Sequence, residues 1–390
     1  MSPSRRNGSG NLESDPRKGR THGSIDDPPQ RVRQTREQAD SSARGTNLMV
    51  THVLDGKSRA YLPRRPLAVS MAVVGEPGSA ALAARRDGNA DAGAIVHSPV
   101  LLILPRVQHE TLIVALPGEG RSTFPTGTTI HVSVAVDSAQ DPDPDRAQLT
   151  ARDVSGLSYL ELATIGPDGD RLAVTTRLED PEVPLGPLAS RARAAARAVL
   201  GVDQVPDERQ TGIDVRIDTS LSMLGSVRNG SVHAIMDIVA GISSVVSADE
   251  APRVSLIGHR SAGLPAADVT ELAARTQEAL LTSKCGVGFD PSVTTVAPVS
   301  GVRRMTLFVT DSASGAARGS DHPLAVTVVA SPSRAALSSP DFVGAVVPPS
   351  PNGVGTSEFL LGDPEIVDQV VEALLRPLAH VHGRLPGTVS

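Results

Sequence analysis

From Gly212 onward, strand-like and helix-like segments alternate along the chain, and this alternation restricts the possible folds more than any other feature of the sequence. Five short apolar runs predict strands: GIDVRID, RVSLIG, MTLFVTD, LAVTVVA and VGAVV. Between and after them, residues 229–246, 268–283 and 364–378 have apolar side chains at helical spacing. We therefore expect an α/β domain over residues 211–390, with a mostly parallel, doubly wound sheet that has helices on both faces.

The region before this domain has a different pattern. Residues 61–180 contain short Val- and Ile-rich runs separated by Gly and Pro, which predict a small mainly-β domain, either a sandwich or a partial barrel. The clearest pair of runs, LSYLELATIGPDGDRLAVTTRL, predicts a hairpin that turns at residues 166–169. Residues 181–210 are expected to form an Ala- and Arg-rich helix and a linker, and residues 1–48, which are poor in apolar side chains, a disordered tail.

Composition excludes several classes of function. The net charge is −6 with scattered basic residues, aromatic residues make up 2% of the chain and tryptophan is absent, so we expect no binding of nucleic acid. The sequence has no apolar run of the roughly 20 residues that a membrane helix needs, so we expect no membrane insertion. The single cysteine, Cys285, cannot form an internal disulfide, which favours a cytoplasmic protein. The oligomeric state is left undetermined.

Polar residues follow two of the predicted parallel strands at the point where each strand ends. The first strand continues into Ile217-Asp218-Thr219-Ser220-Leu221-Ser222-Met223, and a later one into Phe308-Val309-Thr310-Asp311-Ser312. Ligands of open α/β sheets bind at the carboxyl ends of the strands. Hydroxyl and carboxylate oxygens suit a hard ion such as Mg²⁺, which prefers six oxygen ligands. We therefore expect Asp218, Ser220, Ser222 and Asp311 to converge on a metal ion.

The segment IDTSLSM resembles the D-x-S-x-S-M signature of the von Willebrand factor A domain, in its metal-ion-dependent adhesion site, and FVTDS resembles a later strand end of that family. The resemblance covers roughly the last 180 residues of the chain. It implies that Ser220 and Ser222 bind the metal directly, that Asp218 binds directly or through water, and that Asp311 is a ligand or a water anchor. The family's threonine ligand would come from GFDPSVTTV, with Ser292, Thr294 and Thr295 as candidates.

The resemblance also implies a function. Neutral hydroxyl ligands leave the ion most of its charge, so a Mg²⁺ or Mn²⁺ at such a site has an open position for a carboxylate. We therefore expect an intracellular binding module rather than an enzyme, whose cation captures an acidic group of a protein partner.

Two alternatives remain open. In the first, the chain is a serine hydrolase of the α/β type, because RVSLIGHRSAG looks like a strand and nucleophile elbow, and Ser261, Asp311 and His380 follow the chain order of such triads. In the second, the domain keeps its architecture without a metal and acts as a scaffold. Labelling of Ser261 by a fluorophosphonate tests the first, and stabilisation by Mg²⁺ or Mn²⁺ separates the second from the metal-binding function.

Overall fold

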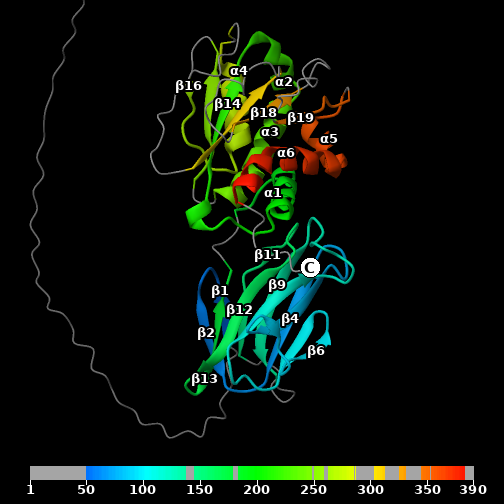
Figure 1. Cartoon of the computed structure of the whole chain (residues 1–390), viewed down its shortest axis with the longest axis vertical. Coiled ribbons are helices and arrows are strands. Elements are labelled where there is room, and N and C mark those ends of the chain that lie inside the picture. Colours follow the sequence, from blue (N-terminus) through cyan, green and yellow to red (C-terminus); the bar gives the residue numbers. More distant parts are fainter. Residues whose placement is uncertain are drawn as a thin grey trace, which may run out of the picture. The chain divides into compact units, whose positions relative to one another are not determined.

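A computed structural model describes the chain from residue 50 to residue 382, with gaps. The described residues are 50–137, 145–178, 183–247, 250–258, 262–284, 286, 303–311, 325–330, 344–351 and 353–382. They form three β-sheets and six α-helices (Figure 1). The predicted disordered tail, residues 1–48, lies outside the described residues.

Two of the sheets pack face to face and form a β-sandwich. The seven-stranded sheet has the order β1-β10-β9-β3-β7-β6, with β11 paired to β9, and the six-stranded sheet has the order β2-β13-β12-β8-β4-β5. Apolar side chains at alternate positions of both sheets, such as Val69, Val134, Ile113 and Val174, are at most 1% exposed and belong to one core cluster. This alternation is expected for sheets with one buried face.

The strands of the sandwich have the following bounds. In the seven-stranded sheet they are β1 (Thr51–Leu54), β3 (Leu67–Val74), β6 (Ile95–Ser98), β7 (Leu101–Leu104), β9 (Thr129–Val136), β10 (Arg146–Leu149) and β11 (Arg152–Asp153). In the six-stranded sheet they are β2 (Arg59–Pro63), β4 (Ala80–Arg86), β5 (Asn89–Ala90), β8 (Thr111–Pro117), β12 (Leu160–Asp168) and β13 (Arg171–Thr176).

The sandwich differs from the expected β-domain at two points. It begins earlier than residue 61, because β1 starts at Thr51. The hairpin of β12 and β13 also turns later than expected. Gly166 and Pro167 pair with residues of β13, and the turn itself is Gly169-Asp170, between the paired residues Asp168 and Arg171. Gly169 has a φ of +61°, a conformation that glycine adopts without steric cost.

The third sheet has the order β16-β15-β14-β17-β18-β19, and four of its five pairings are parallel. Its strands are β14 (Gly212–Asp218), β15 (Arg253–Ile257), β16 (Ala262–Gly263), β17 (Arg304–Thr310), β18 (Ala325–Ala330) and β19 (Gly344–Val347). The edge strand β16 runs antiparallel to β15. The register aligns Ile217 of β14 with Leu256 of β15 and with Val309 of β17, so these side chains lie on one face.

The expectation of a doubly wound sheet is wrong, because among the described elements the helices pack against one face of this sheet. Nearly all buried apolar side chains of the described helices belong to one core cluster. On β14 this cluster contains Ile213, Val215 and Ile217, which lie on one face of the sheet. The opposite face carries polar and apolar side chains: Asp214 and Arg216 of β14 are half-buried, and Ile257 and Phe308 are buried but do not belong to the core cluster of the helices. Arg216 lies over the ring of Phe308, 5.5 Å from its centroid. The described elements therefore make a mixed α/β arrangement in which one face of the sheet is covered by helices.

The helices have the bounds α1 (Pro187–Leu200), α2 (Leu224–Arg228), α3 (Ser231–Val246), α4 (Leu272–Thr282), α5 (Thr356–Gly362) and α6 (Pro364–His382), and a short 3-10 turn, η2 (Leu221–Met223), precedes α2. Helix α1 was expected to belong to a linker region, residues 181–210, but it is part of the α/β core. Ala189 and Ala192 of α1 are buried in the same cluster as the sheet, and α1 passes so close to α3 that a Cβ on Gly241 would lie 2.2 Å from the Ala189 carbonyl oxygen.

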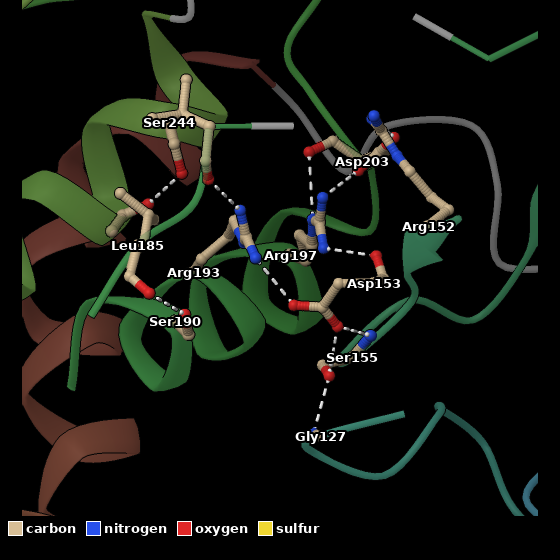
Figure 2. A network of polar contacts seen from close by, with 12 residues as sticks. Gly127, Arg152, Asp153, Ser155, Leu185, Ser190, Arg193, Arg197, Asp203 and Ser244 are labelled. Atoms are coloured by element: carbon tan, nitrogen blue, oxygen red, sulfur yellow. Dashed lines mark hydrogen bonds and ion pairs between the residues drawn. The ribbon is translucent and has the colours of Figure 1, made fainter. Parts of the chain in front are cut away.

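A buried polar network joins β11 of the sandwich to α1 (Figure 2). Asp153 accepts a 2.7 Å hydrogen bond from Arg193 Nη2, and its main-chain oxygen accepts one of 2.9 Å from Arg197 Nη1. Arg152 and Arg197 both form ion pairs with Asp203, which follows α1. Burial opposes ionisation of Asp153, but hydrogen bonds from Ser155 and the nearby arginine charges outweigh it, so the pKa of Asp153 lies below its ordinary value.

Over the described residues, no single helix is long and apolar enough to cross a membrane. The pair Leu221–Arg228 and Ser231–Val246 passes that test by length and composition when taken together, with a bend of 73° between its halves.

Candidate functional site

The candidate site lies where β14 and β17 end side by side. Because the two strands are parallel and Ile217 is aligned with Val309, the residues that follow each of them emerge at the same edge of the sheet. These residues are Asp218 on β14, and Thr310 and Asp311 on and just after β17. This is the carboxyl edge, where ligands of parallel sheets bind.

Asp218 is buried and held from two sides. Asp218 is only 2% exposed. Oδ1 accepts a 2.7 Å hydrogen bond from the main-chain N–H of Ser220, and Oδ2 accepts a 2.9 Å hydrogen bond from the hydroxyl of Thr310. The carboxylate therefore links the loop after β14 to the end of β17, and its orientation is fixed by both.

The two predicted serine ligands lie side by side. Ser220 Oγ is 2.9 Å from Ser222 Oγ, and either hydroxyl can donate. Ser220 is 9% exposed and Ser222 is exposed, while Leu221 between them is 66% exposed. The hydroxyl pair thus lies at the mouth of the site, with Asp218 beneath it.

Contacts with two other segments fix the loop Thr219–Leu221. The main-chain oxygen of Ile257, at the end of β15, accepts hydrogen bonds from both the N–H and the hydroxyl of Thr219. On the other side, Gly286 N–H donates to the Thr219 oxygen and Leu221 N–H donates to the Gly286 oxygen. Gly258 permits this packing, because a Cβ there would lie 2.1 Å from Thr219 Oγ1.

The structure brings Asp218, Ser220 and Ser222 together through these hydrogen bonds, but it does not bond Asp311 to them. Asp311 is half-buried, and among the described residues its carboxylate has no recorded hydrogen bond or ion pair with the other three. The candidate threonine-type ligands Ser292, Thr294 and Thr295 lie outside the described residues. Sequence reasoning missed Thr310, the hydroxyl that holds Asp218, although its position at a strand end beside β14 was a usable signal.

In the part of the chain that the structure describes, no three His, Cys, Asp or Glu side chains gather as a metal-binding group. The oxygens at this edge of the sheet come mainly from the hydroxyl groups of Ser and Thr. These residue types are not among the His, Cys, Asp and Glu side chains of such a group. A hydroxyl-rich set with one or two carboxylates fits Mg²⁺ or Mn²⁺, since these hard ions prefer oxygen ligands and often keep several waters.

The described residues that follow β15 do not form the helix that the hydrolase alternative requires. A nucleophile elbow needs a helix directly after the strand. Here Ala262 and Gly263 form β16, which folds back on β15 by pairing with Leu256 and Ser255. Ser261 itself lies outside the described residues, and so does the side chain of His380, although the backbone of His380 belongs to α6.

No protein-family model matches the chain, and no curated protein matches it in sequence.

Proposed function

We propose that the loop after β14 binds a divalent cation, Mg²⁺ or Mn²⁺, and that the protein uses this cation to capture an acidic group of a protein partner. Ser220 and Ser222 would be direct ligands, and Asp218 and Asp311 would bind directly or through water. The proposal extends the resemblance of IDTSLSM to a metal-ion-dependent adhesion site.

The separation of the two serine hydroxyls is the observation that carries the proposal. Ligands of Mg²⁺ lie 2.0–2.1 Å from the ion in near-octahedral geometry, so two neighbouring ligand oxygens are about 3 Å apart. Ser220 Oγ and Ser222 Oγ are 2.9 Å apart. Contacts with Ile257 and Gly286 hold Thr219 and Leu221 on either side of Ser220, so little change of the loop backbone would be needed for both hydroxyls to bind one ion.

The exposure of the residues supports a role in binding a partner. Asp218 is buried, whereas Leu221 and Ser222 are exposed, so the solvent side of the site is the hydroxyl side. A cation held there would supply an open position for a carboxylate. Leu221 would offer an apolar contact beside that carboxylate, and a contact of this kind contributes to binding through buried area.

A second candidate, the metal-free scaffold, is favoured by one observation. Both carboxylate oxygens of Asp218 already accept hydrogen bonds, and the two serine hydroxyls bond to each other, so the loop is closed without an ion. The two candidates differ in whether Mg²⁺ stabilises the fold.

Thermal unfolding tests this difference. A ligand that binds only the folded state stabilises it by about 2.7 kcal/mol at 100 times its Kd. For a domain of this size, that corresponds to a rise in Tm of roughly 5 to 10 °C. We expect Mg²⁺ and Mn²⁺ to raise the Tm of the parent protein, and to do so much less in Ser222→Ala. Ser283→Ala, which removes a hydroxyl bonded to the Leu280 oxygen at the end of α4, is the control and should respond like the parent.

The partner is tested separately. The single cysteine favours a reducing compartment, so we place the partner in the cytoplasm. A pull-down from native lysate should retain a protein with Mg²⁺, lose it with chelator, and lose it with Ser222→Ala. If the ion raises the Tm but no retained protein depends on it, the metal site stands and the adhesion role does not.

A further inference from the structure

A cavity of about 480 Å³ lies beside α4 in the α/β region. Its walls are the beginning of β15, the segment that follows β16, and one side of α4. Most of the lining is apolar, including Val254, Leu264 and Leu272. Binding sites for small molecules have volumes of roughly 300 to 1,000 Å³, and they combine an apolar lining with a few polar groups. The cavity therefore has the size and the composition of such a site.

Hydrogen bonds hold the walls of the cavity in place. The N–H of Leu264 donates a 2.8 Å hydrogen bond to the main-chain oxygen of Val254, which ties the segment after β16 to β15. The side chain of Gln277 on α4 donates a 2.7 Å hydrogen bond to the main-chain oxygen of Val227, which ties α4 to α2. Because the walls are fixed before a ligand binds, little conformational entropy is lost on binding.

Thr276 is the buried polar residue of the lining. It is 1% exposed, and its hydroxyl forms no hydrogen bond with any of the described residues. Thr282 of the same helix shows the usual arrangement, because its hydroxyl donates a 3.0 Å hydrogen bond to the main-chain oxygen of Glu278, one turn earlier. Buried polar groups normally have a hydrogen-bond partner. The hydroxyl of Thr276 is therefore free to bond to a molecule in the cavity.

The charged residues of the lining lie at its rim. They are Arg275 and Glu278, and both are exposed. Arg275 forms a 2.6 Å ion pair with Glu271, in which each side chain is 54% exposed. The described residues that line the interior therefore offer no buried counter-charge. An ionised group would lose its hydration there without compensation, so the cavity selects an uncharged ligand.

We propose that this cavity binds an uncharged small molecule with an apolar body and one hydroxyl group, an aliphatic alcohol in chemical class, whose hydroxyl forms a hydrogen bond with that of Thr276. A hydroxyl is the matching group because the hydroxyl of threonine can both donate and accept. The apolar body contacts the side chains of Val254, Leu264 and Leu272, and the burial of its surface provides most of the binding free energy.

The cavity is separate from the proposed cation site. Strand β15 is parallel to β14, and Ile257 at its end is paired with Asp218. The cavity contacts the beginning of β15 at Val254, whereas Asp218 lies where β14 ends. The two sites are therefore at opposite edges of the sheet, and a failure of one proposal leaves the other unaffected.

Isothermal titration calorimetry of the full chain with octanol and with octanoate tests the proposal. We expect the parent protein to bind one octanol per chain, and to bind octanoate roughly tenfold or more weakly, because the carboxylate must give up its hydration. Ala279→Phe fills the cavity and should abolish octanol binding. Ala274→Phe, at an exposed position of α4 outside the lining, is the control and should bind like the parent. A parent protein that binds no octanol, or that binds octanoate equally well, overturns the proposal.

The hydrogen bond of Thr276 is tested by two further variants. Thr276→Val keeps the shape of the side chain and should weaken octanol binding roughly three- to tenfold, as expected for the loss of one hydrogen bond. Thr276→Ser retains the hydroxyl and should bind more tightly than Thr276→Val. Equal affinities of the parent and Thr276→Val would contradict the pairing of the two hydroxyls.

Photocrosslinking locates the site in the parent protein and does not depend on the folding of any variant. An octanol that carries a diazirine group is bound, irradiated and mapped by mass spectrometry of the digested chain. We expect the label in residues 264–267 and 272–282, which contribute two walls of the cavity. An excess of unlabelled octanol should prevent this labelling. A label that appears only in other segments would contradict the proposed site.

Discussion

The hydroxyl of Thr310 donates a 2.9 Å hydrogen bond to Oδ2 of Asp218 and so joins the ends of β17 and β14. Both residues are buried, at 1% and 2% exposure. The contact follows from the parallel register, because Ile217 and Val309, the residues just before them, are paired. It holds a carboxylate in place at an edge of the sheet where the loop also brings two hydroxyls together.

Replacing Thr310 by Val should destabilise the protein. The change keeps the shape of the side chain but leaves Asp218 Oδ2 without this donor in a buried setting, which costs about 1 to 3 kcal/mol. Thr310→Ser retains the hydroxyl and should lose less. Urea denaturation measures both, and Thr282→Val, at an exposed position of α4, is the control. Equal stability of the Val and Ser variants would show that this hydrogen bond contributes little.

The network around Asp153 predicts a dependence of stability on pH. The pKa of Asp153 is lower in the folded state than its ordinary value of 3.8, so ionised Asp153 stabilises the fold above about pH 4. This stabilisation is lost as the pH falls from there through the lower folded-state pKa. Asp153→Asn should cost about 3 to 5 kcal/mol near neutral pH, because it leaves the charges of Arg193 and Arg197 less compensated.

The difference between the parent and Asp153→Asn should therefore shrink as the pH falls below about 4. Chemical denaturation over a series of pH values gives this difference directly. Asp168→Asn, which removes an exposed partner of Arg59, is the matched control and should cost little at any pH. A gap between parent and Asp153→Asn that stays constant into acid would contradict the assigned direction of the pKa shift.

Two glycines with similar backbone conformations should respond differently to alanine. Gly156 has a φ of +79°, and a Cβ there would lie 1.9 Å from the Ala194 oxygen of α1. Gly169 has a φ of +61° and open space around it. Gly169→Ala should cost only the roughly 1 to 2 kcal/mol of an unfavourable backbone conformation. Gly156→Ala should cost clearly more, because it also forces the loop after β11 away from α1. Equal losses in thermal or urea unfolding would mean that this close approach is not maintained.

Much of the secondary structure could be predicted because it depends on local patterns. Strand β9 has alternating apolar residues, and helix α3 has apolar residues at helical spacing. Both patterns can be recognised without knowledge of the fold, because each element buries one face. Strand β16 was missed because two residues have no periodicity. The hairpin turn was misplaced because Gly166 and Pro167 favour turns by type, whereas the pairing with β13 keeps both within the strand.

The doubly wound sheet was predicted wrongly because the alternation of strands and helices was taken to place helices on both faces. In β14, however, Asp214 and Arg216 alternate with Ile213, Val215 and Ile217, and only the isoleucine and valine side chains meet the helices. That alternation was visible in GIDVRID.

The candidate site was predictable to the extent that its residues are neighbours in sequence. Asp218, Ser220 and Ser222 fall within one short loop, and their convergence requires only a turn after a strand. The roles of Thr310 and of Gly286 depend on the strand register and on the pairing of Gly286 with Ser220, which sequence spacing does not encode. The network of Asp153 with Arg193 and Arg197 likewise depends on the packing of β11 against α1.

Direct binding of Mn²⁺ is the most immediate measurement of the central claim, that the hydroxyls of Ser220 and Ser222 bind a divalent cation. Free Mn²⁺ has a strong electron paramagnetic resonance signal that decreases when the ion is bound. We predict that the parent protein removes one Mn²⁺ per chain from this signal, that Mg²⁺ restores it, and that Ser220→Ala combined with Ser222→Ala abolishes the effect while circular dichroism stays unchanged. A signal that is the same with the parent protein, with the double variant and in buffer would contradict the proposed cation site.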